Sequence, residues 1–201
     1  MTKKIIIMVG PAGSGKGTQN KLIEKEFGYK PFSMGEILRE EANKKTKLGK
    51  EINQIISKGN MVSLEIASDL IFKKIKTEKS NKILMDGFPR EYDQAVVFDY
   101  FLHTHGFEIV AVIHLNIPKK ESIKRLLLRK RNDDTKKAIE IRLNDYDKIT
   151  KKVINRYKLQ GKLIEINGNQ PIEKVYSEIK TKLKAQKIWF KILELSKILK
   201  N

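Results

Sequence analysis

The chain begins with an apolar run that leads directly into a glycine-rich turn. The run is Lys4 to Val9, and the turn is Gly10 to Thr18. A continuous apolar run of this kind is typical of a strand buried in a parallel sheet. A glycine-rich turn between such a strand and a helix, with a lysine in it, presents backbone N–H groups and an ammonium to polyphosphate. The start of the sequence therefore predicts an α/β domain that binds a nucleotide.

The turn departs from the general phosphate-loop pattern GxxxxGK[ST]. Gly17 occupies the position of the hydroxyl residue, and Thr18 follows one position later. Glycines let several N–H groups approach phosphate oxygens, because no side chain intervenes. Lys16 adds a point charge that can follow a transferring phosphoryl group. A purely structural loop is the alternative, but the strand, the spacing, the lysine and the following helix together favour a nucleotide site.

Length and residue usage narrow the class of protein. A chain of 201 residues suits one α/β domain. The sequence has no cysteine and only three scattered histidines, so we expect neither a disulfide nor a zinc site. No apolar run approaches the roughly 20 residues of a membrane span, and the first run breaks too early for a secretory signal. We therefore expect a cytoplasmic protein without a transmembrane segment.

The chain is strongly basic, with 42 lysines and arginines against 24 acidic residues and a net charge of +18. Such a charge suits any polyanion, including nucleic acid, anionic lipid and nucleotides. The lysines are spread over predicted helix faces, and few aromatic residues stand between them. This distribution favours a solvated surface, so no nucleic-acid partner is expected.

Short apolar runs alternate with longer helical patterns, which is typical of a parallel sheet with crossover helices. We expect strands at 4–9, 31–33, 82–85, 109–116 and 163–166. We expect helices at 16–27, 35–45, 48–57, 63–76, 92–104, 119–130 and 136–157, and from 172 onward. The predicted fold class is α/β, a three-layer phosphate-loop fold in which a parallel sheet of about five strands carries helices on both faces.

A second motif joins an apolar strand to a sharp turn. Asp86 ends the strand, and the turn runs from Gly87 to Arg90. Ligands of open α/β sheets bind beyond the carboxyl ends of the strands, so both side chains should lie near the phosphate loop. Asp86 could hold Mg²⁺ there through its water shell. An aspartate after a strand is often only a turn former, but its place beside a phosphate loop favours the metal.

Four separated motifs resemble those of the nucleoside monophosphate kinases, and within them the adenylate kinases, over roughly residues 4 to 180. The motifs are GPAGSGKGTQ from Gly10, SMGEILR from Ser33, DGFPR from Asp86, and RNDD from Arg131 followed by Arg142. The resemblance implies transfer of the γ-phosphoryl group of ATP, bound with Mg²⁺, to AMP, which gives two ADP. Positioning and dense positive charge are what this reaction needs, because two anionic phosphates must meet.

The resemblance also assigns roles to matching positions. The ATP phosphates would be bound by Gly13, Ser14, Gly15, Lys16, Gly17, Thr18 and Arg129. The catalytic cations would be Lys16, Arg90, Arg125, Arg131 and Arg142. The AMP site would comprise Met34, Arg39, Asn60, Met61, Val62, Gly87, Phe88, Pro89, Arg90, Gln94, Arg131 and Arg142.

Two positions bear on the choice of base. Gln94 stands where adenylate kinases use glutamine to read the adenine edge and where pyrimidine nucleotide kinases use asparagine, which favours AMP. Met34 replaces the threonine that is usual in the family and cannot make its hydrogen bond, so the monophosphate selectivity stays open. A UMP/CMP kinase is the alternative within the family, and a phosphate-loop protein that binds nucleic acid is the alternative from another class.

The predicted kinase domain covers residues 1–184, with an AMP-binding helical segment at about 33–62 and a minimal lid at about 129–135. Many bacterial adenylate kinases carry a small separate domain at the lid, where this chain has only Lys130 between two arginines. The resemblance therefore implies a lid reduced to a tight turn, and the family suggests a monomer.

The last segment, 185–201, lies beyond the usual end of the family. Apolar residues recur there at helical spacing, with lysines between them: Ile188, Ile192, Leu195 and Leu199, beside Trp189 and Phe190. This pattern predicts an amphipathic C-terminal helical extension. Its apolar side would pack on the body of the protein, or else dock on an anionic membrane or a partner.

Overall fold

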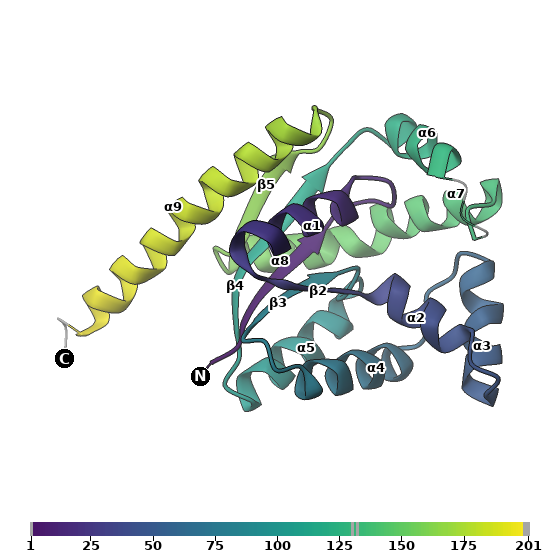
Figure 1. Ribbon diagram of the computed structural model, residues 1–201, viewed down its shortest axis with the longest axis horizontal. Coiled ribbons are helices and arrows are strands. Elements are labelled where there is room, and N and C mark those ends of the chain that lie inside the picture. Colours follow the sequence, from purple (N-terminus) through teal and green to yellow (C-terminus); the bar gives the residue numbers. More distant parts are fainter. Residues whose placement is uncertain (1, 130, 132, 199–201) are drawn as a thin grey trace.

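The computed structural model describes residues 2–129, 131 and 133–198, and of residues 187–198 only the backbone. Within these residues, a parallel sheet of five strands has the order β2-β3-β1-β4-β5 (Figure 1). The strands are β1 (Lys4–Val9), β2 (Lys30–Ser33), β3 (Lys82–Asp86), β4 (Glu108–Asn116) and β5 (Leu163–Asn167). The predicted fold class is confirmed, and each strand lies within a residue of its expected place.

Helices cover both faces of this sheet. They are α1 (Lys16–Phe27), α2 (Met34–Ala42), α3 (Lys47–Ser57), α4 (Leu64–Thr77), α5 (Tyr92–Thr104), α6 (Lys119–Arg129), α7 (Lys136–Asp145), the π-helix η1 (Tyr146–Thr150), α8 (Lys151–Leu159) and α9 (Ile172–Ile198). The side chains of β1 alternate between two cores. Ile5 and Ile7 pack in a core with residues of α4, α5 and α8, whereas Ile6 and Met8 pack with residues of α1 and α9. This burial on both faces explains why the strand is apolar throughout.

The helix predicted over 136–157 is wrong in one respect, because a π-helical turn divides it at Tyr146–Thr150. A π turn bonds residue i to i+5 and is common at functional sites. Here the Tyr146 hydroxyl lies 2.6 Å from His114 Nε2 on β4, and both ends of the turn line the cavity described below. The wider turn keeps Tyr146 and Thr150 on the side of the helix that faces the sheet.

The strand ends place the functional loops side by side. Met8 pairs with Asp86 in the sheet, and Ser33 pairs with Asp86 from the other side, so β1, β2 and β3 end together. The phosphate loop leaves β1 at this edge. Gly13 in this loop has a φ of +82°, and a Cβ there would lie 2.8 Å from the Ser122 carbonyl oxygen. Only glycine fits so close to α6 in that conformation.

Helix α9 runs without a break from Ile172 to Ile198, across the predicted boundary between residues 184 and 185 (Figure 1). Its first half buries Val175, Ile179 and Leu183 in the core shared with α1. The side chains of the predicted apolar stripe lie outside the described residues, and Leu199 lies outside them entirely. No helix in the described part of the chain combines the length and the apolar character needed to cross a membrane.

Candidate active site

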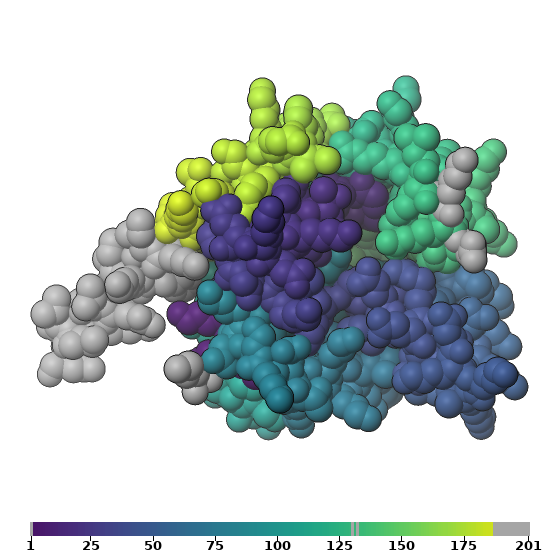
Figure 2. Space-filling model, in the orientation of Figure 1, coloured from purple at the N-terminus to yellow at the C-terminus, as the bar shows by residue number. Residues whose placement is uncertain are grey.

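One cavity of about 790 Å³ opens at the carboxyl ends of β1 and β3. Every residue that the sequence analysis assigned to ATP, AMP, metal or catalysis lines this cavity. In Figure 2 the surface is hollowed between α2 and α3 on one side and α6 and α7 on the other, with the phosphate loop between them. The volume is that of a ligand pocket, and segments far apart in the sequence contribute to it.

The phosphate loop carries a lysine that lies across it. The Lys16 ammonium donates hydrogen bonds to the carbonyl oxygens of Gly10 at 2.8 Å and Pro11 at 3.0 Å. Helix α1 starts at Lys16 and has no acidic residue in its first turn, so no carboxylate competes for its N-terminal N–H groups. Burial lowers the pKa of Lys16, Asp86 opposes this, and Arg90 and Arg129 lower it further. A bound anion would favour the charged form of Lys16 and so oppose the lowering of its pKa by burial and by the neighbouring arginines.

Arg90 is a half-buried cation that lines the same cavity. Burial lowers the pKa of its guanidinium, and the structure gives this group no hydrogen-bond partner among the described residues. Gly87 has a φ of +76°, and a Cβ at that position would lie 3.0 Å from Arg90 Nη2. The glycine thus lets the guanidinium lie against the backbone. Arg90 is placed to receive an anion that the protein itself does not supply.

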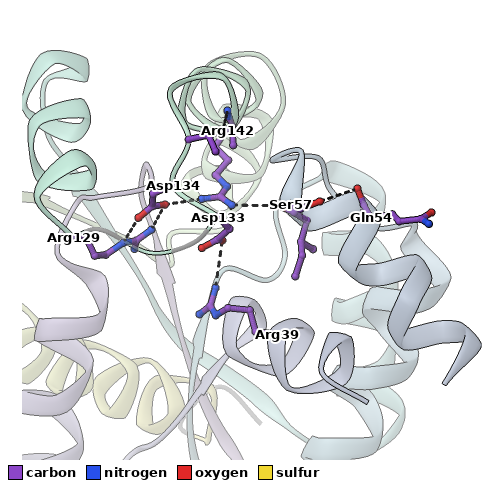
Figure 3. A network of polar contacts seen from close by, with 10 residues as sticks. Arg39, Gln54, Ser57, Arg129, Asp133, Asp134 and Arg142 are labelled. Carbon is purple, nitrogen blue, oxygen red and sulfur yellow. Dashed lines mark hydrogen bonds and ion pairs between the residues drawn. The ribbon is translucent and has the colours of Figure 1, made fainter. Parts of the chain in front are cut away.

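The loop after α6 holds three arginines through two aspartates (Figure 3). The Asp134 carboxylate, with its side chain only 2% exposed, accepts two hydrogen bonds of 2.8 Å from Arg129 and one of 3.0 Å from Arg142. The Asp133 carboxylate accepts one of 2.7 Å from Arg142 and lies 3.8 Å from the Arg39 guanidinium. Cations from opposite sides of the cavity therefore share one pair of carboxylates.

The charge balance of Asp134 follows from these contacts. Burial raises the pKa of its carboxyl, but the hydrogen bond from Arg129 and the charges of Arg129 and Arg142 lower it by more. The net direction is downward, so the group is ionised at neutral pH. Neither Asp133 nor Asp134 was assigned to the site from the sequence, although both belong to the RNDD motif that was noticed there.

The two remaining predicted arginines lie on and after α6. Arg125 donates to Glu121 at 2.7 Å and to the carbonyl oxygen of Gly168 at 3.3 Å, which places it between the phosphate loop and the loop after β5. Burial lowers the pKa of Arg131, and the charges of Arg129 and Arg39 lower it further. Both arginines therefore bring positive charge to the cavity from outside the phosphate loop.

The far end of the cavity has a more apolar lining. Met34 and Val62 are buried at 3% and 6% exposure, and Gln94 is buried at 3%. The Gln94 carboxamide oxygen accepts the Arg90 N–H at 2.9 Å, so its orientation is fixed from the DGFPR turn. Ser63 caps the following helix, since its hydroxyl accepts the Ile66 N–H at 3.3 Å. This end can enclose a base beside an arginine-bound phosphate.

Asp86 is the residue that a metal would use. Its carboxylate lines the cavity at the end of β3, beside the phosphate loop. The described residues contain no group of three or more histidines, cysteines or carboxylates that could hold a metal ion by themselves. Mg²⁺ is usually held by one or two carboxylates together with substrate phosphates and water, and a single cavity-facing aspartate fits that donor set.

Several cavity residues were missed from the sequence. They include the polar residues Asn20, Asp133, Asp145, Tyr146 and Thr150. Only Asp133 carried a signal, because it stands in the RNDD motif. Asp145 has a raised pKa because of burial, which Arg90 and Lys148 partly oppose. Nothing in its local sequence distinguishes it from the other carboxylates on predicted helices.

A family model described as adenylate kinase matches residues 8–162. The chain belongs to the adenylate kinase family. It is 32% identical to the adenylate kinase of Thermus thermophilus over 182 residues, which cover 89% of this chain and 96% of that protein. It is 39% identical to an adenylate kinase of Prochlorococcus marinus, with 90% and 99% covered. It is also similar to UMP-CMP kinase 1 of Oryza sativa, at 33% identity, with 88% and 72% covered.

Proposed function

We propose that the cavity binds ATP and AMP with their phosphates facing each other and transfers the γ-phosphoryl group of ATP to AMP, giving two ADP. The observation that carries this proposal is that one cavity is lined by the phosphate loop, by Arg39 and Arg90, and by the arginines on and after α6. Membership of the adenylate kinase family supports the same reaction. Phosphoryl transfer between two nucleotides held in one cationic cavity needs positioning and positive charge, but no covalent intermediate on the protein.

On the ATP side, the backbone from Gly13 to Thr18 binds the β- and γ-phosphates at the start of α1, where the helix dipole favours anions. Lys16 leaves its two carbonyl partners and follows the transferring group. Arg129 contacts ATP from α6. The pKa shift of Lys16, caused first by burial, supports this role because a phosphate would stabilise its charge.

On the AMP side, Arg39 and Arg90 bind the monophosphate. Arg90 is the better prepared of the two, because its half-buried guanidinium lines the cavity and makes no ion pair with a carboxylate among the described residues, whereas Arg39 lies 3.8 Å from Asp133. Met34, Asn60, Met61 and Val62 surround the base together with Gln94, whose oriented carboxamide contacts its edge. The turn residues Gly87, Phe88 and Pro89 form the wall beneath.

The transfer itself breaks the bond between the γ-phosphorus and the β–γ bridging oxygen and forms a bond from an AMP phosphate oxygen to that phosphorus. The electron pair of the broken bond stays on the former bridging oxygen, which becomes a β-phosphate oxygen of the ADP that remains from ATP. Lys16, Arg125, Arg131 and Arg142 stabilise the charge that spreads over the equatorial oxygens. Arg142 changes partners for this, because its guanidinium donates to Asp133 and Asp134 in the structure.

Mg²⁺ accompanies ATP in this proposal, and Asp86 holds it through water. When bound, the ion neutralises phosphate charge and orients the phosphate chain. The fit rests on a carboxylate that faces the cavity beside the phosphate loop, without an arginine or lysine hydrogen-bonded to it.

A UMP/CMP kinase is the second candidate, and the similarity to UMP-CMP kinase 1 of Oryza sativa supports it. The replacement of threonine by Met34 leaves the base selectivity open. Gln94 favours AMP because the resemblance places it where adenylate kinases use glutamine and pyrimidine nucleotide kinases use asparagine. A panel of AMP, UMP, CMP and GMP separates the two candidates.

The test is a coupled assay of ADP formation from ATP with each monophosphate in turn. We expect AMP to give the highest kcat/KM and Lys16→Ala to abolish detectable turnover. Higher kcat/KM with UMP or CMP would replace the first candidate by the second. Equal activity of Lys16→Ala would contradict the assignment of the phosphate loop.

Cytoplasmic location and a monomeric state stay predictions. Light scattering coupled to size-exclusion chromatography would test the second. Salt-sensitive binding to DNA or RNA at physiological salt would support the nucleic-acid alternative.

A further inference from the structure

Asn20 lies on α1, directly beside the carboxylate proposed to hold Mg²⁺. It is 4% exposed and lines the cavity together with Asp86. Its Nδ2 donates a hydrogen bond of 3.1 Å to Asp86 Oδ2. The two side chains connect the helix after the phosphate loop to the end of β3. Asn20 therefore fixes one oxygen of Asp86 and leaves the other available to the cavity.

The other half of the Asn20 carboxamide has no partner. Its Oδ1 is buried and accepts no hydrogen bond from the described residues. An unsatisfied buried acceptor destabilises the protein, so a group bound in the cavity is the natural donor. Gln19 also has an unpaired side-chain oxygen, but Gln19 does not line the cavity. Of this neighbouring pair, only Asn20 is placed to meet a ligand.

A hydrated metal ion needs acceptors of this kind around it. Water bound to Mg²⁺ directs its lone pairs at the metal and its hydrogens outward, so its protein contacts must accept hydrogen bonds. A carboxamide oxygen accepts without adding charge. The partners of metal-binding carboxylates also set their orientation and strengthen binding.

We infer that Asn20 is a positioning residue for the metal of this kinase: its Nδ2 orients Asp86, and its Oδ1 accepts a hydrogen bond from a water of hydrated Mg²⁺. This inference rests on the proposed function, which places ATP with Mg²⁺ at Asp86. A purely structural role, in which Asn20 only joins α1 to β3, is the alternative that the experiment must separate.

The test is the dissociation constant of ATP, measured by calorimetry once with excess Mg²⁺ and once with a chelator. The ratio of the two values is the metal enhancement, which does not depend on turnover. We expect Asn20→Ala to lower the enhancement about tenfold and to leave metal-free ATP binding unchanged. Asn20→Leu keeps the side-chain volume and should give the same loss, which covers the case in which Asn20→Ala fails to fold.

Two controls complete the design. Ser68→Ala is the matched control, because the Ser68 hydroxyl, like the Asn20 carboxamide oxygen, is buried without a partner among the described residues. Ser68 does not line the cavity, so the substitution should leave the enhancement unchanged. In an Asp86→Asn background, Asn20→Ala should cause no further loss, because residues that act together are not additive. The half-saturating Mg²⁺ concentration of the kinase reaction should rise in Asn20→Ala more than its KM for AMP.

The outcomes are distinct. An unchanged enhancement in Asn20→Ala or Asn20→Leu, an equal loss with and without metal, or full additivity with Asp86→Asn would overturn the inference while leaving the proposed function intact. An absent enhancement in the unaltered protein would instead overturn the proposed metal site, and the inference with it.

Discussion

The cations of this site fall into two groups that are held in different ways. Lys16 and Arg90 lie at the ends of β1 and β3, and neither makes a hydrogen bond to a carboxylate among the described residues. Arg129 and Arg142 instead share Asp134, around the short loop after α6 (Figure 3). The first group can pair directly with a bound phosphate, whereas the second is paired with a carboxylate that a phosphate would have to replace.

The two kinds of pairing contribute differently to catalysis and to the free energy of unfolding. A half-buried cation without a carboxylate partner contributes little to the stability of the nucleotide-free protein, and a phosphate in the cavity would pair its charge. A paired cation stabilises the empty protein, because each charge-assisted hydrogen bond contributes to folding. Unpaired cations of this kind are expected at functional sites. Substitution of Arg90, from the first group, and of Asp134, the carboxylate that holds the second group, should therefore affect activity and unfolding in opposite proportions.

The largest effect is expected at Arg90. Arg90→Met keeps most of the apolar stem and removes the charge, so kcat/KM should fall about 10³-fold. The free energy of unfolding without nucleotide should stay the same or increase, because the lost charge is half-buried and has no carboxylate partner among the described residues. Steady-state kinetics and urea unfolding measure the two quantities. A fall in activity below tenfold, or a clear loss of stability, would remove the distinction between the groups.

Asp134 should show the reverse proportion. Asp134→Asn should lower the free energy of unfolding by about 2 kcal/mol at pH 7, because Arg129 and Arg142 lose their shared carboxylate. Urea unfolding at several pH values measures this.

The pH dependence of that loss has a definite sign. The folded-state pKa of Asp134 is below its ordinary value of 3.8, so its stabilisation is complete above that value and disappears as the pH falls through the lower, folded value. The difference between Asp134→Asn and the unaltered protein should therefore shrink on acidification below about pH 4. A difference independent of pH would contradict the pairing.

A smaller effect concerns water. Arg129 ends α6 and Arg142 lies on α7, and only one residue separates Arg129 from Arg131 in the sequence. A short connection therefore stands where many bacterial relatives carry a separate lid domain. We expect ATP hydrolysis without AMP to exceed that of a relative with a full lid by several-fold, because water is excluded less completely. Phosphate release in the absence of AMP measures it. An equally low rate in both enzymes would show that the short turn is sufficient.

The smallest effect is expected at the base end of the cavity. Met34→Thr restores the hydroxyl that is usual in the family at a position only 3% exposed. One hydrogen bond of about 1 kcal/mol should change the KM for AMP several-fold and leave the KM for ATP unaltered. Kinetics with each substrate varied in turn measure this. A matching change in both constants would mean that the residue acts on the fold rather than on AMP.

The sheet could be predicted from local signals, whereas most of the cavity residues were assigned through the resemblance to the nucleoside monophosphate kinases. The alternation of β1 between two cores follows from its apolar run, and the DGFPR turn follows from its glycine and proline. The π turn at Tyr146 could not be predicted, since its contact with His114 joins residues 32 positions apart. The carboxylate pairing of Arg129 and Arg142 depends on the path of a short loop, which periodicity does not determine. Asn20 looks like any polar residue of an amphipathic helix until Asp86 is placed beside it.

The central claim is that a single cavity holds both nucleotides with their phosphates in contact. Calorimetry with two adenosines joined through five phosphates tests it most directly, because this molecule spans both sites only if they are continuous. We predict one molecule bound per chain, complete exclusion of both ATP and AMP, and weaker binding in Lys16→Ala and in Arg90→Met alike. Two molecules per chain, or continued binding of AMP in the complex, would contradict the account.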